Sequence, residues 1–225
     1  ELTPEPPISL DDYAARQGLD DIDFIKIDVD GSDIDVVLSA AASYEARAVL
    51  GVQVEVSLCG GASPAENTFH NIDRILRGHG FELYDLNTWK YSRAALPSSF
   101  LWDTPWQTVT GKINFGDAVY MRDACAPQTV GLLGRPPASK LLKLACCYEL
   151  YHQQDSAAEL LLRHADRIAP LAPVDRLLDL LAASTGLYGK RKYRAIVADF
   201  QADPRQFYRT AFLFGAQHEV LFLKM

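Results

Sequence analysis

A chain of 225 residues, of which 48% are hydrophobic and 23% charged, is long enough to bury one large core or two modest ones. The formal net charge of −7 argues against a nucleic-acid partner, because such a partner requires clustered Lys and Arg. No apolar stretch approaches the roughly 20 residues that cross a bilayer, and no N-terminal signal pattern is present. We therefore expect a cytoplasmic protein with no membrane partner.

The first half of the chain predicts helices that alternate with strands. The strand after Ile22 carries few polar residues, which is typical of a central strand covered on both faces. A helix separates it from the next strand, so these two strands should run parallel. The expected helices cover 9–17, 32–41 and 67–77, and the expected strands cover 23–29, 49–57, 81–86, 107–115 and 117–122.

The second half is predicted to be helical. We expect a first domain over 1–123, a Pro-rich linker over 124–137 and a helical domain over 138–225. The first helix pair resembles a hairpin of a tetratricopeptide-like array, but no second copy follows at that period, which argues against a solenoid. The expected helices of this domain cover 141–151, 157–168, 174–183 and 192–200.

Four cysteines, Cys59, Cys125, Cys146 and Cys147, lack the CxxC spacing of zinc sites. Cys146 and Cys147 are adjacent in an apolar helical run. We therefore expect buried, reduced thiols rather than disulfides, and no metal site.

Acidic residues follow the first expected strand. Asp28 and Asp30 lie where this strand gives way to a loop, and Glu55 lies late in the next strand. Ligands of an open parallel sheet bind beyond the carboxyl ends of its strands, so these side chains are candidates for a site. Converging carboxylates can orient a hydroxyl group, accept its proton or hold a divalent cation.

A structural role would also explain these acids. Asp30 and Ser32 can cap the following helix, and its dipole favours acids in its first turn. Both explanations stay open for Asp28 and Asp30. For Asp33 and Asp35 we favour the structural one, in which they are solvated acids of the first turn.

Two further features are candidates for chemistry. His70, on an expected helix, can act as a base, although a lone helical His more often has a structural role. An aromatic-rich segment can stack on a sugar ring, cover a pocket or pack in the core. Its members are Trp89, Tyr91, Trp102 and Trp106.

Several segments resemble, in order, the C-terminal half of the FkbM-type S-adenosylmethionine-dependent methyltransferases. They are ISLDDYAARQGLDDIDFIKIDVDGSDIDVVLSAA, VLGVQVEVS, NTFHNIDRILRGHGFELYDL and GKINFGDAVYMRD, which together span Ile8 to Asp123. The resemblance implies an α/β fold, the C-terminal part of a class I (Rossmann-like) methyltransferase sheet, here followed by an all-α region. It also implies O-methylation of a sugar or small-metabolite hydroxyl, with S-adenosylmethionine as the cofactor.

The resemblance places the segment from Lys26 to Gly31 on the family's strand-four motif and Glu55 on the acid of the next strand. Asp30 stands where the family usually has Glu, and its shorter reach could change the substrate or remove catalysis. Nothing in the sequence matches the family's glycine-rich cofactor turn or its second-strand acid, so no cofactor-binding residue is assigned. Because the chain starts at Glu1 without an initiator Met, we expect it to be a segment of a longer polypeptide.

The main hypothesis is an O-methyltransferase whose candidate catalytic residues are Asp28, Asp30, Glu55 and His70. In this hypothesis the acids position an acceptor hydroxyl and the cofactor supplies the methyl group. The alternative is a non-catalytic adaptor or dimerisation module, in which the helical region binds a second copy or another protein. A weaker third option is a metal-dependent hydrolase that uses the Asp cluster.

Overall fold

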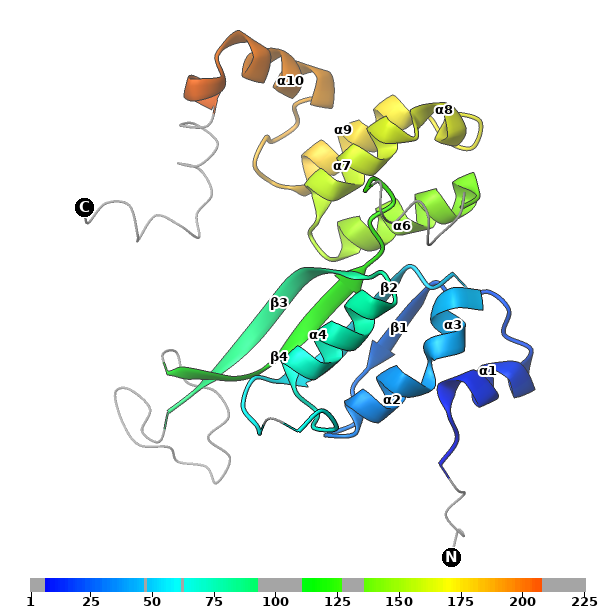
Figure 1. Cartoon of the computed structure of the whole chain (residues 1–225). Helices are drawn as coiled ribbons and strands as arrows, with labels where there is room; N and C mark the ends of the chain where they lie inside the picture. Colours follow the sequence, from blue (N-terminus) through cyan, green and yellow to red (C-terminus); the bar gives the residue numbers. More distant parts are fainter. Residues whose placement is uncertain (1–6, 47, 62, 93–110, 127–135, 208–225) are drawn as a thin grey trace, which may run out of the picture. The chain divides into compact units, whose positions relative to one another are not determined.

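The computed structural model describes residues 7–46, 48–61, 63–92, 111–126 and 136–207. The chain divides into two compact units, Glu1–Arg135 and Pro136–Met225. Figure 1 shows that the first unit combines a sheet with helices and that the second contains helices. None of the helices in the described ranges is long and apolar enough to cross a membrane.

A four-stranded sheet forms the centre of the first unit, with the order β1-β2-β4-β3. As expected, β1 and β2 are parallel, whereas β4 runs antiparallel to both of its neighbours. This mixed arrangement is compatible with part of a Rossmann-like sheet. The strands are β1 (Phe24–Ile27), β2 (Gly51–Ser57), β3 (Glu82–Tyr91) and β4 (Lys112–Met121).

Helices pack on one face of this sheet and enclose the core of the first unit. They are α1 (Leu10–Gln17), α2 (Asp33–Ser39), α3 (Ala41–Ala46) and α4 (Phe69–Gly78). Because successive strand residues point to opposite faces, alternate positions of β1, β2 and β4 supply the sheet's share of the core. The buried cluster includes Ile25, Ile27, Ile34, Val37, Val52, Val54, Val56, Ile72, Leu76, Ala118 and Tyr120.

The other face of the sheet is polar along β1 and β2. Lys26 pairs in register with Gln53, and Glu55 pairs with Asp117 of β4. Lys26 is exposed, and in the described part of the chain β1 has a strand neighbour on one side only. The expectation that the first strand is covered on both faces is therefore wrong.

Several expected elements differ in extent from those observed, and β3 continues to Tyr91 rather than ending at Leu86. The helix expected through Ala41 ends at Ser39, and α3 begins at Ala41. The strands expected on either side of Gly116 form one strand, β4, although 107–110 lie outside the described residues. At Gly116 a Cβ would lie 2.5 Å from the carbonyl oxygen of Asn87, so this glycine permits close approach of β3 rather than ending a strand.

The second unit contains α6 (Ala138–Leu150), α7 (Gln154–Arg163), α8 (Ala165–Ile168), α9 (Val174–Ser184) and α10 (Tyr193–Ala202). The helix expected over 157–168 is interrupted at His164, which is the C-cap of α7 and the N-cap of α8. The apolar faces of α6, α7 and α9 supply most of the buried side chains. These include Leu141, Leu144, Tyr148, Leu160, Leu161, Leu178 and Leu181.

None of the four cysteines forms a disulfide in the described part of the chain, but the expectation that they are buried is wrong. Cys146 is exposed and the other three are partly exposed. Cys146 and Cys147 lie between Leu144 and Tyr148, whose buried side chains face the core of the second unit. The apolar run around these two cysteines therefore reflects the neighbouring core residues rather than burial of the thiols.

Candidate functional site

The turn between β1 and α2 is organised by the carboxylate of Asp33, the first residue of α2. Its Oδ1 accepts a hydrogen bond from the Val29 N–H at 3.0 Å, and its Oδ2 accepts one from the Gly31 N–H at 3.2 Å. Asp33 is fully buried, so the expectation of a solvated acid is wrong for this residue. Asp35 is exposed, in agreement with that expectation.

Asn67 connects this turn to the segment that follows β2. Its Nδ2 donates to Asp33 Oδ2 at 2.9 Å, and its Oδ1 accepts from the Ile34 N–H at 3.1 Å. The next residue, Thr68, forms an isolated parallel bridge with Ser57 at the end of β2. The carboxyl ends of β1 and β2 are therefore held by one hydrogen-bond network.

Three carboxylates converge beside this network. Asp28, Asp30 and Glu55 each offer an oxygen that lies within 4.8 Å of the other two. Asp28 also forms an ion pair with Lys26, with 2.7 Å between Oδ2 and Nζ. Asp30 has a φ of 52°, a left-handed conformation that Asp adopts more readily than most residues.

The prediction that Ser32 caps α2 is confirmed for its position but not for its hydrogen bond. Ser32 occupies the N-cap position, but its side chain makes no capping hydrogen bond. The acid that binds backbone N–H groups in this turn is instead Asp33, which lies one residue later. Asp28 and Asp30 are exposed and so remain accessible to a ligand.

Glu55 holds its proton more tightly than an isolated glutamic acid. Its pKa is raised above 4.5, first by burial and then by the negative charges around it. Burial and like charges both disfavour the ionised carboxylate. The charges that act on Glu55 are those of Asp28, Asp33, Asp117 and Asp30.

Asp117 adds a fourth carboxylate to this face of the sheet, opposite Glu55. The pKa of Asp117 is raised, mainly by burial. The charge of Asp28 also raises it, whereas the charge of Lys26 and a hydrogen bond with Gln53 lower it. The resulting site is rich in hydrogen-bond acceptors. It suits hydroxyl or amino groups, or a cation, and it repels anions.

An aromatic pair lies in the neighbouring row of the same sheet face. Trp89 of β3 and Phe115 of β4 are register partners, and their rings stack with centroids 5.2 Å apart. Asn87, two residues before Trp89, is the register partner of Asp117. Of the aromatic segment noted in the sequence, Trp102 and Trp106 lie outside the described residues.

His70 is not one of the three side chains that converge. It lies in the first turn of α4, is exposed, and has its Nε2 at 3.4 Å from the Thr68 hydroxyl. The bridge between Thr68 and Ser57 places this turn near the end of β2. His70 is therefore on the correct edge of the sheet for a role in the site but outside the acidic cluster.

Sequence reasoning did not identify Asn67 and Asp117, and it gave Asp33 the wrong environment. Asp33 and Asn67 are 34 residues apart, so no local pattern reveals their contact. Asp117 did carry a signal, because it precedes Ala118 in an expected strand and so points away from the core. Finding its partner Glu55 required the register between β2 and β4.

Comparison with known protein families bears on this site directly. Residues 3–83 match the family model described as the methyltransferase FkbM domain. This segment is similar to part of an FkbM-type methyltransferase domain. The match contains all four candidate catalytic residues but ends 40 residues before Asp123, to which the resemblance was expected to extend. Searches among curated proteins and among solved structures gave no match to the chain.

Proposed function

We propose that the first unit is the acceptor-binding part of an S-adenosylmethionine-dependent O-methyltransferase. The FkbM match supports a methyltransferase family, whose members in general use this cofactor. The observation that carries the proposal is the convergence of Asp28, Asp30 and Glu55 within 4.8 Å. These acids lie toward the carboxyl ends of parallel strands, where open α/β sheets bind their ligands.

In this proposal the acids position a hydroxyl group and receive its proton. S-adenosylmethionine supplies an electrophilic methyl group on a sulfonium sulfur. Transfer of this methyl group to the acceptor oxygen would release the hydroxyl proton, which Glu55 would accept. The raised pKa of Glu55 suits this step. His70 is the second candidate for the base.

Positioning contributes more than base strength to such a displacement, because the attacking oxygen must lie in line with the leaving sulfur. Asp28 and Asp30 are assigned to this orienting role. The Asp33–Asn67 network supports the turn that bears them. A positioned site requires hydrogen-bonded support of this kind from residues outside it.

A sugar or another hydroxylated metabolite is the acceptor class that we propose. Acid side chains bind sugar hydroxyls, and the apolar faces of a sugar ring can pack on aromatic rings. The stacked Trp89–Phe115 pair lies one row from Asp117 and Asn87. This face of the sheet therefore offers both kinds of contact.

The acidic cluster fits only part of the cofactor. Its carboxylates can bind the amino and hydroxyl groups of S-adenosylmethionine, but they repel its carboxylate group. The turn after β1 also has two of its N–H groups bound by Asp33. We therefore assign the main cofactor contacts to sequence outside this chain, in agreement with the lack of a glycine-rich turn.

Calorimetry with S-adenosylmethionine and a methyl-transfer assay test the proposal. In the full-length protein, Glu55→Gln should lower methyl transfer at least tenfold while it changes cofactor affinity less than twofold. Tight cofactor binding by residues 1–225 alone would contradict our assignment of the cofactor contacts. Failure of the full-length protein to bind the cofactor would favour the adaptor alternative, and loss of activity with a chelator would favour the metal-dependent one.

A further inference from the structure

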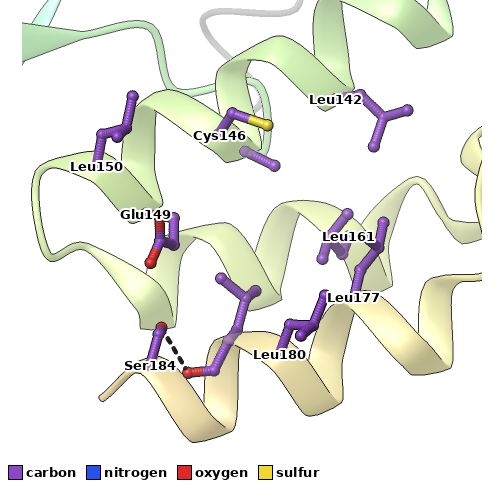
Figure 2. Close-up of a pocket in the computed structure, with 10 residues that line it drawn as sticks. Leu142, Cys146, Glu149, Leu150, Leu161, Leu177, Leu180 and Ser184 are labelled. Atoms are coloured by element: carbon purple, nitrogen blue, oxygen red, sulfur yellow. Dashed lines mark hydrogen bonds between the residues drawn. The ribbon is translucent and has the colours of Figure 1, made fainter. Parts of the chain in front are cut away.

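The second unit carries an apolar groove between α6, α7 and α9 (Figure 2). Its volume is about 500 Å³. Leucines dominate its lining, and Figure 2 shows several of their side chains directed into the space between the helices. They are Leu142, Leu150, Leu161, Leu177, Leu180 and Leu181.

Two of these leucines are highly exposed in the described structure. The exposed fraction is 71% for Leu150 and 58% for Leu180. Contiguous exposed apolar surface generally marks a binding site for another apolar surface. The groove is therefore a candidate for covering by an apolar segment.

The polar groups of the groove do not favour a polar small molecule. Such ligands are oriented by several convergent polar groups. Here the polar side chains in the lining are those of Cys146, Glu149 and Ser184, and the Ser184 hydroxyl already donates to the Leu181 carbonyl at 3.0 Å. An apolar peptide with one positive charge matches this lining better.

The chain itself contains such a peptide beyond α10. Residues 208–225, which lie outside the described residues, include the run Val220-Leu221-Phe222-Leu223 followed directly by Lys224. Four large apolar side chains match the leucine lining. The charge of Lys224 complements that of Glu149.

The connection is long enough for this peptide to reach the groove. The N-terminal end of α10 contacts α9 through Asp179, whose carboxylate accepts the Tyr193 N–H at 2.9 Å. From that contact the ten-residue α10 leads away by about 15 Å, and the 12 residues from Tyr208 to Glu219 span up to about 40 Å when extended. A tethered segment also acts at a high effective concentration.

We propose that Val220–Leu223 bind in the α6–α7–α9 groove of the same chain, with Lys224 close to Glu149. The groove is then an internal docking site for the C-terminal segment. An external partner of the helical unit has to displace this segment. The inference is independent of the proposed methyltransferase function.

Cys146 provides a direct test because it is exposed and lines the groove. The rate at which N-ethylmaleimide labels each cysteine can be followed by peptide mass spectrometry in the whole chain. The double substitution Leu221→Asp and Leu223→Asp should raise the labelling rate of Cys146 at least fivefold. The matched double substitution Thr210→Asp and Gln217→Asp should leave it unchanged, and Cys59 in the first unit is the internal reference.

An unchanged labelling rate of Cys146 in the Leu221→Asp and Leu223→Asp chain overturns the proposal. A wild-type labelling rate that falls as protein concentration rises also overturns it, because a second copy then covers the groove. Leu180→Asp gives an independent variant, since this side chain is largely exposed and its replacement leaves the helix core intact. It should raise labelling of Cys146 to a similar extent.

Discussion

Asn67 donates a hydrogen bond of 2.9 Å to the buried carboxylate of Asp33, and this contact joins the turns that follow β1 and β2. The same carboxylate also binds the N–H groups of Val29 and Gly31. Asp28 and Asp30 are part of the turn that these bonds hold. The geometry of the acidic cluster therefore depends on a residue that does not belong to it.

Replacement of Asp33 by Ala should destabilise the first unit by about 2–4 kcal/mol. It removes the buried, charged acceptor of three hydrogen bonds, which come from two backbone N–H groups and the Asn67 amide, and hydrogen bonds to charged groups are among the stronger ones. Urea unfolding followed by tryptophan fluorescence measures this unit, because all three tryptophans lie within it. Asp35→Ala, at an exposed position of the same helix turn, should change stability by less than about 0.5 kcal/mol. Equal effects of the two substitutions would contradict the role given to Asp33.

Glu55→Gln should alter the pH dependence of stability. Because the folded-state pKa of Glu55 is raised above 4.5, the folded state binds more protons than the unfolded state as the pH rises from 4.5 through that pKa. Stability therefore falls with rising pH in this window, and Glu55→Gln should remove part of the fall. At pH 7 the variant should be more stable, by less than about 1 kcal/mol.

Hydrogen exchange of the β2 amides, measured between pH 4.5 and 7.5, reports this change in the first unit. Asp20→Asn, an exposed acid of the same unit, is the control and should retain the wild-type pH profile. A Glu55→Gln profile that coincides with the wild-type profile would show that the pKa of Glu55 is not raised in the folded protein.

Arg122→Lys should destabilise the first unit by about 2 kcal/mol. The buried guanidinium donates to the carbonyls of Val49, His79 and Tyr44, and it stacks 3.9 Å above the ring centre of Phe81. Burial lowers the pKa of Arg122 to about 10, so the group is already desolvated. A lysine ammonium cannot reproduce this planar set of contacts. Thermal unfolding should show a clear loss for Arg122→Lys and almost none for Arg74→Lys, whose side chain is exposed.

Gly116→Ala should destabilise the sheet by about 1–3 kcal/mol. The added Cβ would meet the Asn87 carbonyl oxygen at 2.5 Å, so β3 must move away from β4. Gly78→Ala is the matched control, because nothing lies within 4 Å of its added Cβ. Gly78 is the last residue of α4, and alanine has a higher helix propensity than glycine. It should stabilise the unit by about 0.5 kcal/mol. Stabilisation by both substitutions would contradict the close approach at Gly116.

The sequence predicted the order and type of most elements because their signals are local. The parallel pairing of β1 and β2 followed from the helix between them, and the helical second unit followed from its periodicity. The predictions from sequence were wrong where tertiary contacts determine the bounds or environment of an element. Strands were expected on either side of Gly116, but β4 continues through this residue, which lies against Asn87 of β3.

In the candidate site, too, local features could be predicted from the sequence, whereas tertiary contacts could not. Asp28, Asp30 and Glu55 could be chosen from their positions at the ends of expected strands, and the structure brings these three together. The burial of Asp33 could not be predicted, since it requires Asn67 from another connection. The opposition of Glu55 and Asp117 likewise depends on a strand register that no local pattern specifies.

Acceptor binding tests the central claim most directly. Saturation-transfer difference NMR with a panel of methyl glycosides and small hydroxylated metabolites can be recorded on the wild-type chain, on the double variant Asp30→Asn and Glu55→Gln, and on Asp35→Asn. We predict that at least one hydroxylated compound binds the wild type and Asp35→Asn equally, and binds the double variant at least tenfold more weakly. Equal binding to all three proteins, or no binding to any of them, would contradict the assignment of this acidic face to the acceptor.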